Sequence, residues 1–176
     1  IASTWLLLIG ALDDRYDLSS RSRFLAQIIA AGVMIYFAGL QANEISDVVG
    51  RAGFHLGVLT PVFTIFIAVG LINALNMADG SDGYLAGQVI AALSLFAGLA
   101  FYAGNITLTL QCALFVAAVL GFWFWNMRFP WQARASVFLG DAGSTFLGCA
   151  VVWFALQLTQ DGNHPVSAVL APWMIA

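Results

Sequence analysis

The chain has 176 residues, of which 61% are hydrophobic and 9% charged, whereas a typical soluble domain is about 25% charged. It carries six arginines, no lysine and nine acidic residues, for a net charge of -3. Such a chain has no basic surface to neutralise a phosphate backbone, so nucleic acid is excluded as a main partner. The composition also argues against a soluble globule and predicts a protein of the lipid bilayer.

Five apolar stretches are long enough, or nearly so, to cross roughly 30 Å of hydrocarbon. In chain order they are residues 24–42, 58–75, 84–103, 106–127 and 143–158. Shorter apolar stretches stand at both ends of the sequence, and we interpret them as helices that the chain boundaries cut. The sequence therefore predicts an all-α polytopic membrane protein with about five full transmembrane helices and two truncated ones. Residues 1–176 are expected to form a single integral-membrane domain, an internal fragment of a longer protein.

One segment between the predicted spans has a different pattern. In residues 44–58, apolar and polar residues alternate loosely around Gly50 and Gly53. This pattern favours a short β-hairpin on the outer surface of the membrane.

The arginines indicate which loops face the cytoplasm, because Lys and Arg, and not acids, set orientation. The first, third and fifth loops hold all of them except Arg51: Arg15, Arg21, Arg23, Arg128 and Arg134. The same loops hold six acids: Asp13, Asp14, Asp17, Asp79, Asp82 and Asp141. Carboxylates at a membrane edge are costly unless they face water, a cation or an arginine. A shared polar site on the cytoplasmic face is predicted, although loops are also simply where acids reside.

The first candidate motif is the acidic pair Asp13-Asp14. In a helix, Asp13 and Asp17 would share a face while Asp14 points elsewhere. Close carboxylates raise one another's pKa, so one could accept a proton, or a divalent cation could keep both ionised. Arg21 and Arg23 could hold phosphate oxygens through charge-assisted hydrogen bonds. The alternative is a solvated loop that only sets orientation.

The second motif runs from Asn73 to Gly83 and interrupts two apolar stretches without a basic residue. Asn76, Asp79 and Asp82 are spaced by three, so a helical turn would place their oxygen atoms on one side. Mg²⁺ prefers such oxygen ligands, and the spacing does not match a calcium-binding EF-hand. The alternative is an ordinary turn.

In the third motif, Gly140 and Gly143 frame Asp141, and Ser144 follows as a possible cap of the next helix. Asp141 is therefore a candidate metal ligand, or only the signal of a helix start. The three motifs together contain no catalytic Ser-His-Asp or zinc-ligand set and no phosphate-binding loop of the ATPases. Metal-assisted phosphoryl chemistry is the class that they favour.

In this order, the motifs resemble those of the polyprenyl-phosphate N-acetylhexosamine-1-phosphate transferases. Asp13-Asp14 matches the family's acidic pair, 76–83 its NxxDGxDG stretch and 140–144 its GDxGS stretch. The resemblance covers essentially the whole chain and is strongest to the bacterial branch that acts on undecaprenyl phosphate with N-acetylglucosamine-1-phosphate. Two features differ. The family's downstream His-rich loop is not in this sequence, and Arg21 and Arg23 stand where a lysine is usual.

The resemblance implies an activity and a role for each site residue. A sugar-1-phosphate would pass from a UDP-N-acetylhexosamine to undecaprenyl phosphate with release of UMP, which starts a cell-envelope polysaccharide. Mg²⁺, or Mn²⁺ in its place, would be held by Asp141 and Asn76. Asp13 would deprotonate or position the lipid phosphate with Asp14 in support. Contacts to the substrates are assigned to Asn73, Asp79, Asp82, Arg21 and Arg23.

The resemblance also places the protein in the bacterial inner membrane, with its active site on the cytoplasmic face. The fragment alone is expected to be inactive, and a homodimer is an open prediction. Two other functions are weighed against this one. A cation- or proton-coupled transporter would place acids near mid-membrane, whereas every acid here lies in a loop. A non-catalytic membrane scaffold would leave the acidic loops without a purpose.

Overall fold

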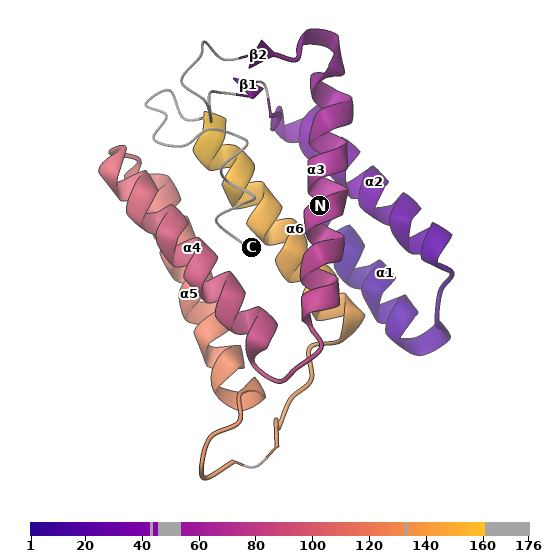
Figure 1. The fold of residues 1–176 in the computed structure, drawn as a ribbon, viewed down its shortest axis with the longest axis vertical. Coiled ribbons are helices and arrows are strands. Elements are labelled where there is room, and N and C mark those ends of the chain that lie inside the picture. Colours follow the sequence, from indigo (N-terminus) through magenta and orange to yellow (C-terminus); the bar gives the residue numbers. More distant parts are fainter. Residues whose placement is uncertain (43, 46–53, 133, 161–176) are drawn as a thin grey trace.

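The computed structural model describes residues 1–42, 44–45, 54–132 and 134–160, which form a helical bundle (Figure 1). Two very short strands, β1 (Glu44–Ile45) and β2 (Phe54–His55), pair antiparallel, and a 3-10 turn, η1 (Gly57–Leu59), follows them. The helices are α1 (Ala2–Tyr16), α2 (Ser20–Ala38), α3 (Thr60–Ala78), α4 (Tyr84–Tyr102), α5 (Ile106–Asn126) and α6 (Gly140–Gln160). The predicted all-α fold class is confirmed for the described residues.

Four helical segments are long and apolar enough to cross a membrane: Gly57–Ala78, α4, α5 and α6. The chain is therefore a multi-pass membrane protein, and four of the five predicted spans correspond to these four segments. The fifth prediction, 24–42, corresponds to α2, which begins earlier, at Ser20, and ends earlier, at Ala38. Because Arg21 and Arg23 lie in its first turn and the helix ends at Ala38 and not at Ala42, its apolar part is shorter than predicted, and a count of five spans stays a prediction.

The remaining fold predictions concern the ends of the chain and the hairpin. The apolar stretch at the start of the sequence forms part of α1, whereas the last apolar stretch, 171–176, lies outside the described residues. That the chain boundaries cut these two helices stays a prediction. Both strands fall within the predicted 44–58 segment, but the residues that would form its turn, 46–53, also lie outside them. A complete hairpin, and its position outside the membrane, stay predictions.

Local signals set several helix ends. The Ser19 hydroxyl accepts a hydrogen bond from the Ser22 N–H at the start of α2, and the Asn105 side chain accepts one from the Leu108 N–H at the start of α5. Pro61 stands in the first turn of α3, where its missing N–H is not needed. Gly39 ends α2 with a φ of 64°, a conformation that favours glycine.

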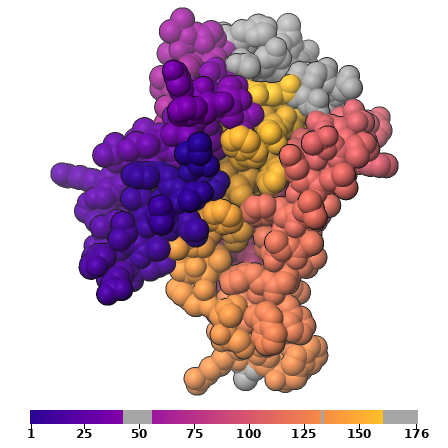
Figure 2. Space-filling view, turned by 180° about the vertical axis from the view of Figure 1, so that it is seen from behind, coloured from indigo at the N-terminus to yellow at the C-terminus, as the bar shows by residue number. Residues whose placement is uncertain are grey.

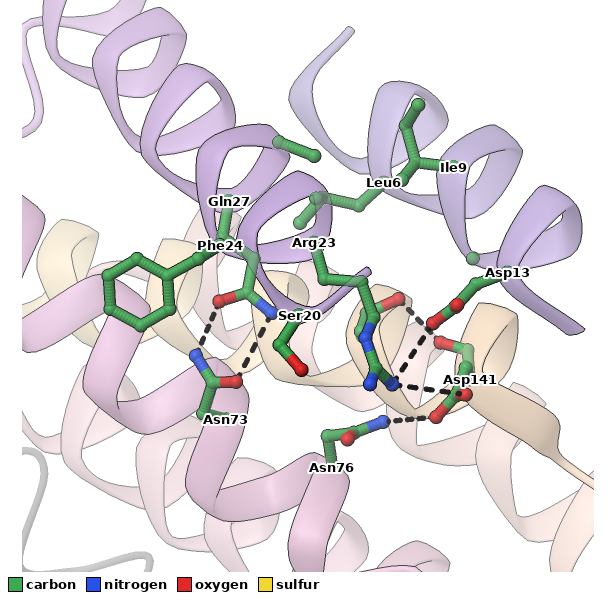
Figure 3. A pocket seen from close by; sticks show the side chains of 13 residues that line it. Leu6, Ile9, Asp13, Ser20, Arg23, Phe24, Gln27, Asn73, Asn76 and Asp141 are labelled. Carbon is green, nitrogen blue, oxygen red and sulfur yellow. Dashed lines mark hydrogen bonds and ion pairs between the residues drawn. The ribbon is translucent and has the colours of Figure 1, made fainter. Parts of the chain in front are cut away.

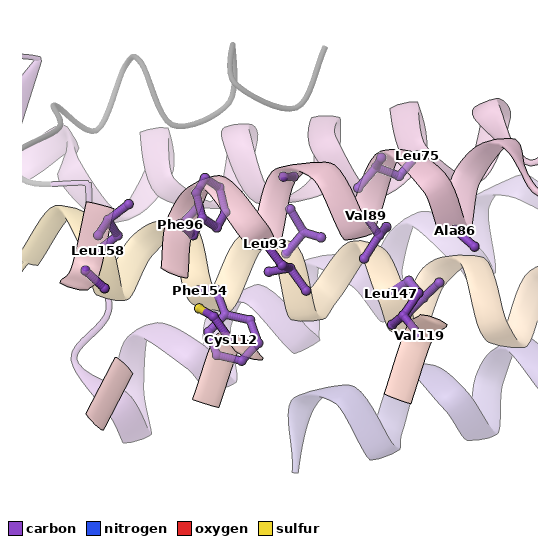
Figure 4. Close-up of a cluster of buried hydrophobic side chains, with 14 of the residues drawn as sticks. Leu75, Ala86, Val89, Leu93, Phe96, Cys112, Val119, Leu147, Phe154 and Leu158 are labelled. Atoms are coloured by element: carbon purple, nitrogen blue, oxygen red, sulfur yellow. The ribbon is translucent and has the colours of Figure 1, made fainter. Parts of the chain in front are cut away.

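Helix α6 is the centre of the bundle and lies between two groups of helices (Figures 1 and 2). In the most apolar 18 residues of α6, 67% of the residues are buried, whereas in the corresponding part of α5 only 17% are. One cluster of apolar side chains joins α6 to the α4–α5 hairpin and includes Leu93, Phe96 and Leu158, all almost fully buried (Figure 4). A second cluster joins the other face of α6 to α1, α2 and α3 and includes Met34 and Ile72.

The three loops that carry the sequence motifs lie at the same end of the bundle, opposite the strand pair (Figure 1). They are the connections between α1 and α2, between α3 and α4, and between α5 and α6. Because α6 begins at this end, between α1 and α3, its first turn meets the ends of both helices. The fold thus brings together residues that are far apart in the sequence.

Candidate active site

A pocket of about 190 Å³ is lined by residues of α1, α2, α3 and α6 at the end of the bundle that carries the motifs (Figure 3). Its lining is polar on one part and apolar on another. The polar side chains include Asp13, Arg23, Gln27, Asn73, Asn76 and Asp141, and the apolar ones include Leu6, Ile9 and Phe24. Such a pocket suits a molecule with a charged head and an apolar tail.

Arg23 links two of the predicted site residues. Its Nη1 atom lies 3.2 Å from Oδ2 of Asp13 and 3.7 Å from Oδ2 of Asp141. Figure 3 shows the guanidinium reaching from α2 to the carboxylates, which come from α1 and α6. The structure therefore brings together Asp13, Arg23 and Asp141, three of the predicted site residues.

Asp13 is the most buried acid of the group, with 2% of its side chain exposed. Its Oδ1 accepts a hydrogen bond of 2.8 Å from the Leu18 N–H. Burial raises the pKa of this carboxyl, and the nearby Asp141 carboxylate adds to the increase, while the Leu18 hydrogen bond and Arg23 oppose it. The predicted alignment with Asp17 is wrong, because Asp17 ends α1 in a left-handed conformation with a φ of 50°.

Asn76, in the last turn of α3, contacts the start of α6. Its amide nitrogen donates to Oδ1 of Asp141 at 2.8 Å and to Oγ of Ser144 at 2.7 Å. The two predicted metal ligands are thus neighbours. Ser144 does not cap α6 as predicted, because α6 begins at Gly140 and Ser144 already lies inside its first turns.

A pair of amides lies deeper in the pocket. The Asn73 amide donates to Oε1 of Gln27, and Gln27 donates in return to Oδ1 of Asn73 at 3.5 Å. Asn73 also donates to the Val69 carbonyl at 2.8 Å. Because these bonds occupy both side chains, Asn73 contributes to the pocket by joining α2 to α3.

Asp14 points away from the pocket, toward the N-terminus of α6. Its Oδ1 accepts from the Asp141 N–H at 2.8 Å and its Oδ2 from the Ala142 N–H at 3.2 Å. These N–H groups have no partner within the helix, so the carboxylate caps α6 from another helix. The two members of the acidic pair therefore have different surroundings, with Asp13 in the pocket and Asp14 at the helix cap.

Two glycines allow this close approach of α1 and α6. A Cβ atom on Gly10 would lie 2.7 Å from the Ala142 nitrogen and 2.9 Å from the Asp141 carbonyl oxygen. Gly140 has a φ of 68°, and a Cβ there would lie 2.8 Å from Oδ2 of Asp14. Both positions exclude larger residues, because Gly10 lies directly against the backbone of α6 and Gly140 lies directly against the Asp14 carboxylate.

Asp79 and Asp82 lie in the turn after α3, outside the lining of the first pocket. Burial, together with the Asp141 and Asp82 carboxylates, raises the pKa of Asp79 to about 6. Asp82 accepts a hydrogen bond of 2.6 Å from Nε of Arg128, and this bond lowers its pKa. Asp82 and Arg128 line a second cavity of about 460 Å³ together with Arg134, Ser136, Val137 and Phe138.

Asn126 is a structural residue that the sequence motifs do not reveal. Its side chain accepts from the Gly83 N–H at 2.8 Å and donates to the Val137 carbonyl at 2.9 Å. It therefore fixes the turn of the second motif against the loop that precedes the third. The only sequence signal is a polar residue at the end of an apolar stretch.

Arg21 is the one predicted site residue in the α1–α2 region that joins neither the pocket nor the helix cap. It is exposed in the first turn of α2 and does not line the pocket. Since residues two apart on a helix face different directions, Arg23 faces the carboxylates and Arg21 does not.

The side chains around Asp141 are of the chemical types that bind magnesium. No group of three His, Cys, Asp or Glu side chains in the described ranges is placed to hold a metal. Mg²⁺, however, is commonly held by one or two carboxylates, with waters and substrate phosphates completing its shell. Asp141 would supply a carboxylate, with the Asp13 carboxylate beside it across Arg23, and Asn76 would add its amide oxygen by turning over from its present hydrogen bond.

Comparison with known proteins gives one matching family. Residues 1–159 match the family described as Glycosyl transferase family 4. The chain is 36% identical over 171 residues to the undecaprenyl-phosphate alpha-N-acetylglucosaminyl 1-phosphate transferases of Escherichia coli O157:H7 and Yersinia pestis. These alignments cover 97% of this chain and 46% and 47% of the relatives.

A more distant relative comes from Bacillus subtilis (strain 168). It is named "Probable undecaprenyl-phosphate N-acetylglucosaminyl 1-phosphate transferase" and is 35% identical over 146 residues, which are 83% of this chain and 39% of that protein. The chain thus spans about half the length, or less, of the curated relatives that it matches.

Proposed function

Because the chain belongs to glycosyl transferase family 4, we propose that the protein transfers N-acetylglucosamine-1-phosphate from a UDP-sugar to undecaprenyl phosphate and releases UMP. The names of its relatives support this reaction. The observation that carries the proposal is the meeting of Asp13, Asn76 and Asp141 at the polar part of a pocket that also has an apolar wall. A polyprenyl phosphate likewise combines a charged phosphate with an apolar chain. A related N-acetylhexosamine would satisfy the same chemistry.

The described residues support a division of roles. Arg23 and the buried Asp13 would position the acceptor phosphate, since both line the pocket beside its apolar wall. Asp141 and Asn76 would hold Mg²⁺, or Mn²⁺ in its place, and the ion would neutralise the charge of the donor pyrophosphate. Asp79 and Asp82 would contact the nucleotide sugar beside the second cavity. Asp14 would keep Asp141 in position by capping the start of α6.

The proposal includes the bacterial inner membrane as location, with the site on the cytoplasmic face. Five of the six arginines lie at the end of the bundle that carries the site, in the last turn of α1, the first turn of α2 and the loop between α5 and α6, which favours that orientation. A homodimer stays a prediction. No observation favours a transporter, because Asp13, Asp79 and Asp141 all lie at helix ends and not in the middle of the bundle.

The test is the activity of the purified full-length protein. We expect UMP release from UDP-N-acetylglucosamine only when undecaprenyl phosphate and Mg²⁺ are both present, with loss of release in EDTA. The Asp141→Asn variant should lose at least about a hundredfold in rate, a loss in the range known for single groups that stabilise a reacting charge. UDP-N-acetylgalactosamine in parallel measures sugar preference. Absence of UMP release with every UDP-N-acetylhexosamine would overturn the proposal.

A further inference from the structure

The position of Arg23 suggests more than a contact to substrate. A single nitrogen, Nη1, lies beside Oδ2 of Asp13 and Oδ2 of Asp141. These are the carboxylates that the proposed function assigns to the acceptor phosphate and the metal. The guanidinium therefore lies where a cation would have to lie to contact both side chains.

The charges of this group do not balance, because two carboxylates face one guanidinium. A divalent cation would balance the pair completely. The guanidinium and a metal ion cannot both stay between the carboxylates, because two positive charges in contact repel strongly outside bulk water.

The Arg23 side chain also has space to move away from the carboxylates. Its side chain is 37% exposed and lines a pocket that is open beside it. A guanidinium is a planar fork of N–H donors that suits phosphate oxygens. A displaced Arg23 would therefore remain within the site and face any phosphate group in the pocket.

We propose that Arg23 is the resident counter-ion of Asp13 and Asp141 and exchanges with the divalent cation during the working cycle. In the metal-free protein, the guanidinium holds the two carboxylates together. It leaves them when a divalent cation is held there, and its N–H donors then become available to the substrate phosphate. This inference rests on the proposed function, since it takes the metal and the phosphate from it.

The first experiment measures Mn²⁺ binding to the purified full-length protein without substrates, from the spin-resonance signal of the free ion. Removal of the competing guanidinium in Arg23→Gln should tighten Mn²⁺ binding about tenfold, which corresponds to about 1.4 kcal/mol. Arg21→Gln is the matched control, because it removes the same charge two residues away from a side chain that does not line the pocket. We expect it to change the affinity less than about twofold, since exposed charges are well screened.

A second measurement uses the wild-type protein and does not depend on the folding of a variant. Phenylglyoxal modifies accessible arginines, and mass spectrometry compares Arg23 with Arg21 in the same sample. Mg²⁺ should increase the modification rate of Arg23 severalfold relative to Arg21, as expected for release from an ion pair.

The outcomes separate this inference from the proposed function. Equal Mn²⁺ affinities of Arg23→Gln and Arg21→Gln, weaker binding by Arg23→Gln, or protection of Arg23 by Mg²⁺ would each overturn the exchange. The wild-type protein would still release UMP in these cases. Absence of UMP release overturns the proposed function instead, whereas tighter Mn²⁺ binding by Arg23→Gln would support the exchange even then.

Discussion

At the start of α6, two backbone N–H groups have the Asp14 carboxylate as their acceptor. Loss of a capping side chain costs about 0.5–2 kcal/mol, so we expect Asp14→Ala to lower the free energy of unfolding by about that amount. Asp14→Asn should be intermediate, because an amide offers one acceptor oxygen where the carboxylate uses two. Thermal unfolding of the three proteins in the same detergent measures this order, and an Asp14→Ala variant as stable as the wild type would contradict it.

A second prediction at the residue scale concerns pH. The pKa of Asp79 is raised from 3.8 to about 6 in the folded protein. Its protonated form is therefore favoured by folding, and the stability from this group is lost as the pH rises from about 4 to above 6. In EDTA, the melting temperature of Asp79→Asn minus that of the wild type should increase over this interval and then stay constant.

Asp82 provides the control of opposite sign for this pH experiment. Its pKa is lowered by the hydrogen bond from Arg128, so its carboxylate contributes stability above its ordinary pKa and loses that contribution as the pH falls through the lowered value. Asp82→Asn should therefore be less stable than the wild type at neutral pH. A flat difference for Asp79→Asn across the whole range would contradict the assignment.

At the scale of elements, the crossing of α1 and α6 depends on Gly10. A methyl group there would meet backbone atoms of Asp141 and Ala142, which cannot rotate away. Gly10→Ala should therefore destabilise the protein by about 1–3 kcal/mol and lower activity by moving Asp13 away from Asp141. Gly32→Ala is the control, because a methyl group on that face of α2 meets nothing within 4 Å. Thermal unfolding and UMP release check both variants, and equal behaviour of the two would contradict this account.

At the scale of the whole molecule, orientation can be measured with single cysteines. Ser136 lies exposed in the loop before α6, and Thr107 lies exposed at the opposite end, at the start of α5. The native Cys112 and Cys149 are buried, so we expect little labelling of these two residues by a maleimide. If arginine-rich loops are cytoplasmic, an impermeant maleimide should label Thr107→Cys in intact cells and Ser136→Cys only after permeabilisation. The reverse pattern would place the site outside.

The sequence is sufficient for the parts of this structure that depend on local patterns. Apolar stretches predict α3 to α6. The placement of the acidic loops on one face of the membrane predicts a shared polar site, and Asp13, Asn76 and Asp141 do line one pocket. The partner of Asp14 could not be predicted, because a cap supplied by a residue 127 positions away leaves no local signal. The link through Asn126 is hidden for the same reason, since its partners belong to two different loops.

The contact between α1 and α6 also has a consequence for biosynthesis. α1 leaves the ribosome first among the described helices and α6 last, so every helix between them is made before the pair can meet. Until then, Asp14 has no N–H groups to accept, and Asp13 and Arg23 have no Asp141 beside them. The site is therefore complete only after α6 has been made and has packed into the bundle. A nascent chain that stalls before α6 carries the acidic pair but lacks Asp141.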